Sequence, residues 1–432
     1  MSIPAAAPGI LDYNSGPMII KASHAILEPG RVLRDVRLET AGPVIYSITS
    51  GPSPFHSLPD FDFGNAVITP GLVNPHAHLE LEFCHGQVPF DGSFVNWLQR
   101  IRDMKQDNGG ATAFPADSLR QLAAAGCTTV VDHHTGDMDW ENIAGCGPRH
   151  VPLREYFEFN NHEPDPDAMR AAAHRGYAAH STYTTSPEVA RACRALSDEA
   201  GLPLSIHLSE FRGEIQLIRD GQSPEIEGLL GRAGAIDPDW RGTGKSPVQY
   251  CAGLGLLDGP CYAIHVNYLE PGDIDVLAAQ RPTVVYCPRS HAYFGHRDHP
   301  FAELALAGVP LALGTDSLAS NDRLSPLHEA ALARRAFPDV PAETIFAAIT
   351  SAALGPLGWD HRLGTLHPGR GADVAVFPLS GNPGGGFAEV LDAVIAGGQS
   401  ALTLCAGKVI HADGRYQKRG AAPHNLELQH SG

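Results

Sequence analysis

From residue 67 onward, short apolar runs alternate with segments that have a helical pattern. Each run is a continuous stretch of apolar and β-branched residues, as expected for strands that are covered on both faces. The eight runs are Val67–Leu79, Thr128–His134, Pro152–Asn160, Tyr177–Thr185, Leu202–Leu208, Cys261–Leu269, Thr283–Ser290 and Pro310–Ser317. Eight strand–helix units predict an α/β fold built as a (β/α)8 TIM barrel. An open doubly wound sheet is the alternative, and the lack of a glycine-rich dinucleotide-binding motif after any run counts against it.

Several segments between the runs begin with helix-capping signals. Ser186-Pro187 places a hydroxyl at the N-cap and a proline at the first helical position. The pairs Ser246-Pro247 and Ser325-Pro326 repeat this start. Gly201 follows the first of these segments and is suited to a left-handed C-terminal cap. The connection over residues 80–127 is unusually long, and long connections at the carboxyl-terminal face of a barrel often carry specificity.

Both ends of the chain have a different pattern, in which short β-rich runs are separated by Gly and Pro. Met18–Ile20 and Val44–Ile48 precede the barrel, and Asp373–Phe377 and Ala401–Ile410 follow it. We therefore expect the two ends to combine into one small β-sandwich domain. The expected organisation is residues 1–67 for its first part, 68–360 for the barrel, and 361–432 for its second part, which ends in a polar tail from Lys418.

The composition narrows the class of protein. The chain has 432 residues, of which 43% are hydrophobic, so it can bury a large core. A formal net charge of −17 argues against nucleic acid or an anionic membrane as a partner. The eight cysteines form no CxxC pair and mostly lie in apolar runs, which favours buried free thiols over disulfides. The N-terminus does not resemble a signal peptide and no run approaches the ~18 apolar residues of a membrane span, so we expect a cytoplasmic protein.

Histidines and acids gather where the predicted strands end, which is where barrel enzymes carry their working residues. In order along the chain they are His76, His78, His207, Glu210, His265 and Asp316. His76 and His78 are two apart, so in a strand they point the same way. Three imidazoles and one carboxylate would suit Zn²⁺ or Fe²⁺ and disfavour Ca²⁺ or Mg²⁺. The alternative is that these are ordinary histidines at strand ends and that His265 is a hydrogen-bonded core residue.

The motifs at these positions, taken in order, resemble those of the amidohydrolase superfamily. The run PGLVNPHAHLE is followed by HLSE, an isolated strand-six histidine, CPRS and LGTDS. Within the superfamily the chain is most similar to the chlorohydrolase and adenosine-type deaminase branch. The closing segments LGTLHPGRGADVAVF and AGKVIHADG fit the same branch, so the resemblance extends over nearly the whole chain.

This resemblance implies a metal-dependent aminohydrolase with one divalent ion, held by His76, His78, His207 and Asp316. Zinc is the first choice, with iron(II) or manganese(II) as alternatives. Binuclear relatives carry a carboxylated lysine on the fourth strand, and residues 178–185 contain none. Glu210 is expected to give a proton to a ring nitrogen of the substrate, His265 to assist the water, and Asp316 to accept the proton of that water.

The substrate is the least determined part of the prediction. Several motifs, including LELE after His78, FVNWL and KSPVQY, resemble the deaminases of aminodeoxyfutalosine, an adenine nucleoside of a menaquinone pathway. S-adenosylhomocysteine, methylthioadenosine or adenosine is the alternative, followed by a nucleobase or triazine. Candidate substrate contacts are Glu80, with Glu82 beside it, Trp97, His180, Arg289 and His291.

Other readings stay open. Arg289, His291, where relatives commonly have Asn, and His180 can equally be surface or supporting residues. His133 or His134 can reach the site, although a structural role or a place at the edge of the substrate is favoured. The chain can also be a catalytically silent metal-binding protein, since a fold does not fix a function, or a hydrolase of a cyclic amide. We expect a small-molecule substrate and no nucleic-acid or membrane partner, and a homodimer would fit the family.

Overall fold

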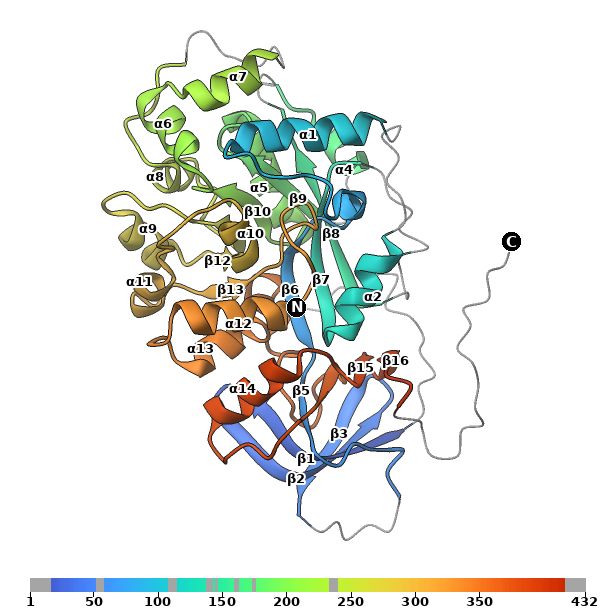
Figure 1. The fold of residues 1–432 in the computed structure, drawn as a ribbon. Helices are drawn as coiled ribbons and strands as arrows, with labels where there is room; N and C mark the ends of the chain where they lie inside the picture. Colours follow the sequence, from blue (N-terminus) through green and yellow to red (C-terminus); the bar gives the residue numbers. More distant parts are fainter. Residues whose placement is uncertain are drawn as a thin grey trace.

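Eight short parallel strands stand at the centre of the larger domain, and a second sheet lies at one end of it (Figure 1). In the barrel, each strand pairs with the next strand along the chain, as successive strand–helix units require. The barrel strands are β6 (Leu72–Ala77), β7 (Cys127–His134), β8 (Arg149–Tyr156), β9 (Gly176–Ser181), β10 (Leu204–Leu208), β11 (Cys261–His265), β12 (Thr283–Tyr286) and β13 (Leu311–Leu313). The prediction of a TIM barrel with eight strands is confirmed.

This computed structural model describes most of the chain. The described residues are 17–51, 58–107, 115–136, 143, 147–158, 163–172, 176–232 and 240–415, without the side chains of 229–232. The predicted polar tail from Lys418 lies outside them. Among the described residues, no helix combines the length and the apolar character needed to cross a bilayer.

The barrel closes where its first and last strands meet. Ala77 and Asp316 form a parallel bridge, and the backbone N–H groups of Thr315 and Asp316 both donate to the carbonyl of His76, at 3.1 Å each. The amide of Asn74 adds two bonds to Thr315, donating to its hydroxyl at 2.7 Å and accepting from its backbone N–H at 3.2 Å. These bonds bring the end of β13 against the histidine-bearing end of β6.

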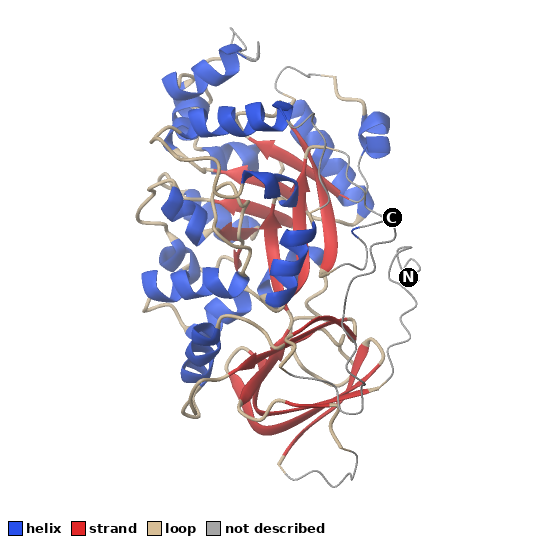
Figure 2. Ribbon diagram, turned by 45° about the vertical axis from the view of Figure 1, so that its right-hand side comes forward, coloured by secondary structure: helices blue, strands red, loops and turns tan. Residues whose placement is uncertain are grey.

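Helices surround the barrel (Figure 2). The capping signals act as predicted: the hydroxyls of Ser186, Ser246 and Ser325 accept from the backbone N–H three residues on, and Gly201 is left-handed at φ 65°. The helices are α1 (Phe94–Asp107), α2 (Ala116–Ala124), α4 (Pro166–Ala172), α5 (Pro187–Ala200), α6 (Arg212–Asp220), α7 (Pro224–Arg232), α8 (Pro247–Gly253), α9 (Asp273–Gln280), α10 (Pro288–Tyr293), α11 (Phe301–Leu306), α12 (Pro326–Ala336) and α13 (Ala342–Ala348), with 3-10 turns η1 (Leu79–Cys84) and η2 (Ala352–Leu357).

The two ends of the chain share a single mixed sheet that curls around its own apolar core (Figure 2). Its strands are β1 (Met18–Glu28), β2 (Arg31–Ala41), β3 (Val44–Ser50), β4 (Phe61–Asp62), β5 (Ala66–Pro70), β14 (Val374–Pro378), β15 (Leu402–Cys405) and β16 (Lys408–Ala412), and α14 (Phe387–Gly397) follows β14. The run Val67–Leu79, which was predicted to be one strand, is two. Strand β5 pairs with β1 and β14, and the barrel begins at β6 after Gly71.

The junction between barrel and sheet leaves no room for side chains at two glycines. A Cβ on Gly71 would lie 2.2 Å from Oγ1 of Thr128, and Gly71 donates its N–H to the carbonyl of Asp373 at 2.9 Å. Gly126 has φ +83°, and a Cβ there would lie 2.6 Å from the ring of Phe377. Both positions therefore favour glycine, one for close approach and the other also for its backbone conformation.

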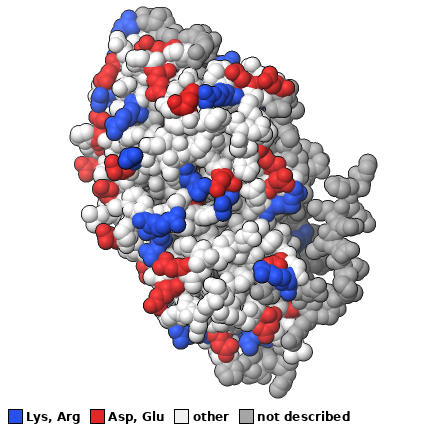
Figure 3. All heavy atoms as spheres, in the orientation of Figure 1, with Lys and Arg blue, Asp and Glu red and all other residues white. Residues whose placement is uncertain are grey.

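The cysteines in the described part of the chain are free thiols, as predicted. Six are buried and Cys405 is partly buried, while Cys146 lies outside the described residues. On the surface, acidic and basic side chains are interspersed with uncharged ones over the face in Figure 3. The negative net charge is therefore not gathered into one patch on that face.

An ion pair between Arg149 and Asp373 joins the barrel to the second sheet. Two nitrogens of Arg149 at the start of β8 donate to the buried carboxylate of Asp373 at 2.7 and 3.2 Å. We expect Asp373→Ala to lower the free energy of unfolding by about 3 kcal/mol, because it leaves a mostly buried guanidinium unpaired.

Asp392→Ala is the matched control for that substitution. Asp392 pairs with Arg334 but its side chain is 54% exposed, so the expected loss is below about 1 kcal/mol. Denaturant unfolding followed by tryptophan fluorescence measures both variants. Equal losses in the two variants would contradict the assignment of the junction pair.

Candidate active site

Three imidazoles converge at the carboxyl ends of the barrel strands. His76 lies near the end of β6, His78 directly follows that strand, and His207 comes from β10 on the other side of the barrel. One ring nitrogen from each lies within 4.8 Å of the others, a group able to hold a metal ion. The side chains of His76 and His207 are buried, and burial lowers the pKa of His76 to about 4 and that of His207 well below its usual range. Both rings are therefore neutral at neutral pH, as metal ligation requires.

The Nδ1 atoms of these three rings face protein groups. Nδ1 of His76 lies 3.1 Å from Nδ1 of His133, and Nδ1 of His207 donates to the carbonyl of His180 at 2.8 Å. Nδ1 of His78 lies 3.6 Å from a carboxylate oxygen of Glu155. Partners on Nδ1 leave Nε2 for the metal, a common arrangement around metal-binding histidines. Nε2 of His76 is indeed buried without a hydrogen-bond partner.

Asp316 supplies a carboxylate to the same point. Its Oδ1 lies 3.6 Å from Nε2 of His76 and 3.8 Å from Nε2 of His78, and it accepts from the N–H of Ser317 at 2.7 Å. The hydroxyls of Ser290 and Ser320 donate to its Oδ2 at 2.6 and 3.0 Å. Although burial opposes the charge, the nearby imidazoles of His76, His265 and His78 hold the pKa of Asp316 below its usual range. The donor set of three nitrogens and one carboxylate oxygen fits a zinc-type ion.

A second group of three possible ligands overlaps the first. Glu155, His180 and His207 also offer ligand atoms within 4.8 Å of one another. Nδ1 of His207 faces this second group, 3.6 Å from Glu155, but that nitrogen already donates to the carbonyl of His180. Nδ1 of His180 is similarly engaged with the hydroxyl of Thr184 at 2.6 Å. The first group is therefore the better metal site.

Glu210 and His265 form a pair beside the imidazoles. Nε2 of His265 lies 3.3 Å from a carboxylate oxygen of Glu210, and both side chains are buried. Glu210 follows β10 by two residues, and the turn is held by Asn267, whose side-chain amide donates to the carbonyl of Glu210 at 2.9 Å. Burial raises the pKa of Glu210 well above its usual range, and the negative charges of Asp316 and Glu214 raise it further. Burial therefore favours the protonated form of Glu210, in which the carboxyl group can donate a proton.

The backbone is strained where these side chains emerge. Ser209, His265 and Asp316 have φ values of 50°, 72° and 57° in the left-handed region, which residues other than glycine rarely adopt. Such conformations persist only where the surrounding structure holds them, and they often mark functional sites. Here these three residues lie at or just after the carboxyl ends of β10, β11 and β13. Their left-handed conformations turn the chain away from the strand direction next to the site.

Two acids predicted as substrate contacts are engaged by the protein. The buried carboxylate of Glu80 pairs with Lys105 at 2.7 Å and accepts from the hydroxyl and N–H of Thr135. Glu82 accepts from the N–H of Ser118 at 2.6 Å, in the first turn of α2. The structure places both carboxylates in contacts that hold η1 against α1, α2 and the end of β7.

The other residues predicted to contact the substrate lie around the three imidazoles, some next to them and some farther away. Trp97 is buried against Phe94 and Phe294, in the aromatic layer above the barrel. The ring of His180 lies 4.8 Å from that of His207. Arg289 is paired with Asp322, and His291 is buried on α10. Of the five candidates, His180 lies directly beside a metal-site imidazole.

Several residues at the site were not singled out from the sequence. Glu155 stands near the end of the buried strand β8, where an acid needs partners, and this was the available signal. Ser205 lies two residues before His207 and therefore on the same face of β10. Glu214 accepts from the N–H of Glu210 at 2.8 Å and from the hydroxyl of Thr182 at 2.6 Å. From sequence alone, an acidic residue on a helix, such as Glu214, is expected to be solvent-exposed.

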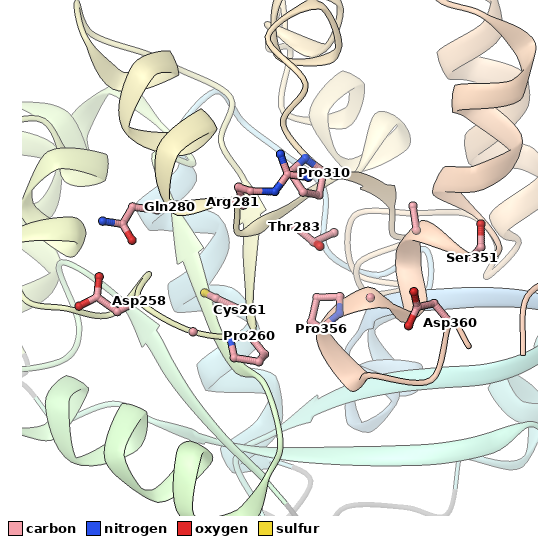
Figure 4. Close-up of a pocket in the computed structure, with 13 residues that line it drawn as sticks. Asp258, Pro260, Cys261, Gln280, Arg281, Thr283, Pro310, Ser351, Pro356 and Asp360 are labelled. Carbon is pink, nitrogen blue, oxygen red and sulfur yellow. The ribbon is translucent and has the colours of Figure 1, made fainter. Parts of the chain in front are cut away.

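Two cavities lie outside the histidine cluster. One of about 540 Å³ borders the loop after β13 and is lined in part by Arg289 and Ser320. The other, of about 490 Å³, lies where β11, β12 and β13 begin and is bordered by Asp258, Arg281 and Asp360 (Figure 4). The amino ends of barrel strands contribute to stability rather than catalysis. The second cavity is therefore separate from the catalytic end.

The sequence of this chain matches known proteins over most of its length. The model of the amidohydrolase family matches residues 67–410. The 5-methylthioadenosine/S-adenosylhomocysteine deaminase of Desulfovibrio desulfuricans is 30% identical over 390 residues, covering 83% of this chain and 82% of that protein. The aminodeoxyfutalosine deaminase of Deinococcus radiodurans is 29% identical over 317 residues, covering 63% of this chain and 69% of that protein.

Solved structures show the same fold. Helicobacter pylori aminofutalosine deaminase, in complex with methylthio-coformycin, superposes with a TM-score of 0.75 at 18% identity, covering 91% of this chain and 99% of that one. An adenosine deaminase from Xanthomonas campestris with bound zinc gives a TM-score of 0.72 at 22% identity, covering 94% of each chain.

The two overlapping ligand groups can be separated by substitution. We expect His207→Ala to abolish metal binding, because it removes a ligand common to both groups. We expect His180→Ala to retain the metal, because its ring belongs only to the second group. Metal content per folded chain, measured by plasma emission spectrometry, tests both variants. Loss of the metal from His180→Ala would assign it to the second group instead.

Proposed function

Because the chain belongs to the amidohydrolase family, we propose that it is a metal-dependent hydrolytic deaminase of a 6-aminopurine nucleoside. The observation that carries this proposal is the buried Glu210 carboxyl, 3.3 Å from His265 and adjacent to the group of three imidazoles and Asp316. A proton donor beside a metal site is what deamination of an aromatic amine requires. The curated relatives named above are deaminases of adenine nucleosides, which supports the same reaction.

The metal would be held by His76, His78, His207 and Asp316. When bound, a divalent ion lowers the pKa of water to about 7 and so supplies hydroxide at neutral pH. Zinc is our first choice, with iron(II) and manganese(II) as alternatives, because all accept imidazole and carboxylate ligands. The zinc named for the Xanthomonas campestris protein supports the first choice.

Asp316 and His265 would manage the attacking water. Asp316 is ionised, and its Oδ1 faces the imidazole group while two serine hydroxyls fix Oδ2. It can therefore accept the proton that the water gives up. Burial lowers the pKa of His265 to about 3, so the ring is neutral and can accept a hydrogen bond from water. Its carbonyl is held by Nε2 of His299 at 2.9 Å, which fixes the position of the residue.

Glu210 would protonate the substrate. Transfer of its proton to a ring nitrogen makes the neighbouring amino-bearing carbon electrophilic, and attack at that carbon follows. The proton accepted by Asp316 then passes to the exocyclic amine, which leaves as ammonia when the carbon–nitrogen bond breaks. The Glu210 carboxylate regains a proton from the new hydroxyl group as the product carbonyl forms. General acid–base assistance of this kind contributes about 10²–10⁴-fold to a rate.

Two substrates are candidates within this class. Aminodeoxyfutalosine is our first candidate, because of the sequence motifs and the 29% identity to the aminodeoxyfutalosine deaminase of Deinococcus radiodurans. Methylthioadenosine or S-adenosylhomocysteine is the second, favoured by the relative that covers 83% of the chain, against 63% for the Deinococcus protein. Both candidates carry a 6-aminopurine, so the reacting centre is the same.

Substitution of Glu210 tests the proposed reaction. We expect the wild-type chain, loaded with zinc, to release ammonia from aminodeoxyfutalosine, methylthioadenosine, S-adenosylhomocysteine or adenosine. Glu210→Gln is expected to keep the metal and to lose about 10²–10⁴-fold in turnover, because an amide cannot exchange the proton. A coupled ammonia assay and metal analysis on the same preparations provide the two measurements.

Different results point to the other readings. Unchanged turnover in Glu210→Gln would remove Glu210 from the mechanism. A folded chain that binds zinc and releases no ammonia from any of these nucleosides would favour a catalytically silent metal protein. Ring opening without ammonia would favour hydrolysis of a cyclic amide.

The pH dependence of the rate follows from the raised pKa of Glu210. The acid form is the active one, so kcat/KM should fall as the pH rises through that pKa. Glu214→Gln removes a nearby negative charge that helps to raise the pKa of Glu210, and the alkaline decline should therefore move to lower pH.

Glu214→Gln is a mild substitution for this purpose. A glutamine can still accept from the N–H of Glu210, and its amide can donate to the hydroxyl of Thr182. The pH–rate profiles of the wild type and the variant are compared at one salt concentration. An alkaline limb that stays in place or moves to higher pH would show that Glu214 does not act on Glu210 in this way.

A further inference from the structure

A line of hydrogen bonds leads from the metal site into the barrel interior. Nδ1 of His76 on β6 lies 3.1 Å from Nδ1 of His133 on β7. Nε2 of His133 lies 2.7 Å from the hydroxyl of Ser205 on β10. All three side chains are fully buried. The ring of His133 therefore connects the strand that carries His76 to a strand on the opposite side of the barrel.

The two facing Nδ1 atoms can share only one proton in neutral rings. If His76 donates, its Nε2 is free of hydrogen and can bind a metal. If His133 donates instead, the proton of His76 sits on Nε2 and blocks the ligand atom. The direction of one hydrogen bond thus decides whether His76 can act as a ligand.

Ser205 is compatible with the first direction. When His76 donates to His133, the proton of His133 must sit on Nε2, and the hydroxyl of Ser205 accepts it at 2.7 Å. Without that hydroxyl the buried Nε2–H of His133 would lose the partner that lies 2.7 Å away, which is unfavourable. The hydroxyl can also rotate to donate, so the line can reverse when the ligand site is vacated.

We propose that His133, supported by Ser205, is a positioning residue that fixes the ring and the tautomer in which His76 offers Nε2 to the metal. The inference rests on the proposed metal site. His133 itself does not touch the metal or the substrate in this account. Residues with such a supporting role typically change metal affinity or activity by about 10–100-fold when substituted.

Four variants test this role in the full-length chain. His133→Phe keeps the ring volume and removes both nitrogens, so zinc affinity should fall by about 10–100-fold. His133→Asn places a side-chain oxygen near the position of Nδ1 and should recover part of the affinity. Ser205→Ala should weaken binding less than His133→Phe. Tyr262→Phe is the control, since it removes a different buried bond in the barrel, from the Tyr262 hydroxyl to the carbonyl of Ala353 at 2.7 Å.

The measurements separate positioning from mere stability. Zinc dissociation constants come from competition with a chromophoric chelator, and unfolding of the metal-free chains gives their stability. The visible spectrum of the Co²⁺-loaded chains reports the ligand geometry. We expect altered affinity and an altered Co²⁺ spectrum in His133→Phe, and wild-type values for both in Tyr262→Phe.

Each outcome decides the proposal. Wild-type zinc affinity and Co²⁺ spectrum in His133→Phe would overturn it while leaving the metal site intact. If His133→Phe does not fold, Ser205→Ala and His133→Asn carry the test, and wild-type affinity in Ser205→Ala then overturns the proposal. A wild-type chain that binds neither Zn²⁺ nor Co²⁺ would overturn the metal site and this inference together.

Discussion

Closure of the barrel between its first and last strands is the constraint on which the site depends. The backbone N–H groups of Thr315 and Asp316 donate to the carbonyl of His76, and Ala77 pairs with Asp316. These bonds place a carboxylate from the end of the chain's last barrel strand beside two imidazoles from the first. Residues 240 positions apart in sequence thus share one point, because parallel strands in a closed barrel bring all their carboxyl ends to one face.

Burial shifts the pKa values of the titratable groups at the site in opposite directions. The same desolvation lowers the pKa of His76 to about 4 and raises that of Glu210 well above its usual range. Asp316 escapes this trend because the nearby imidazoles of His76, His265 and His78 lower its pKa more than burial raises it. Neutral imidazoles, an ionised carboxylate and a protonated carboxyl group therefore coexist within one small volume. Separation of pKa values by environment is a general way for a site to assign acid and base roles.

The sequence predicted much of this arrangement for identifiable reasons. Continuous apolar runs and Ser-Pro caps are local signals, and they located the eight strands and several helix starts. The candidate residues stood at the ends of the predicted strands, and the resemblance of their motifs to the amidohydrolase superfamily implied which of them are metal ligands. The structure brings His76, His78, His207 and Asp316 together, and Glu210 next to His265.

Features that depend on contacts distant in sequence were not predictable in the same way. The apolar pattern passes through Gly71 without interruption, so only sheet pairing divides β5 from β6. Glu80 was predicted to contact the substrate, but in the structure its carboxylate binds Lys105 and Thr135, which are distant in sequence. Glu155 and Ser205 gain their roles from histidines on other strands. A single sequence carries no local mark of such partners.

Anomalous diffraction at the zinc edge from crystals of the zinc-loaded protein tests the central claim most directly. We expect one peak about 2.0–2.2 Å from Nε2 of His76, His78 and His207 and from Oδ1 of Asp316. A peak bound instead by Glu155 and His180, or a barrel with intact strand ends and no peak among these residues, would contradict it.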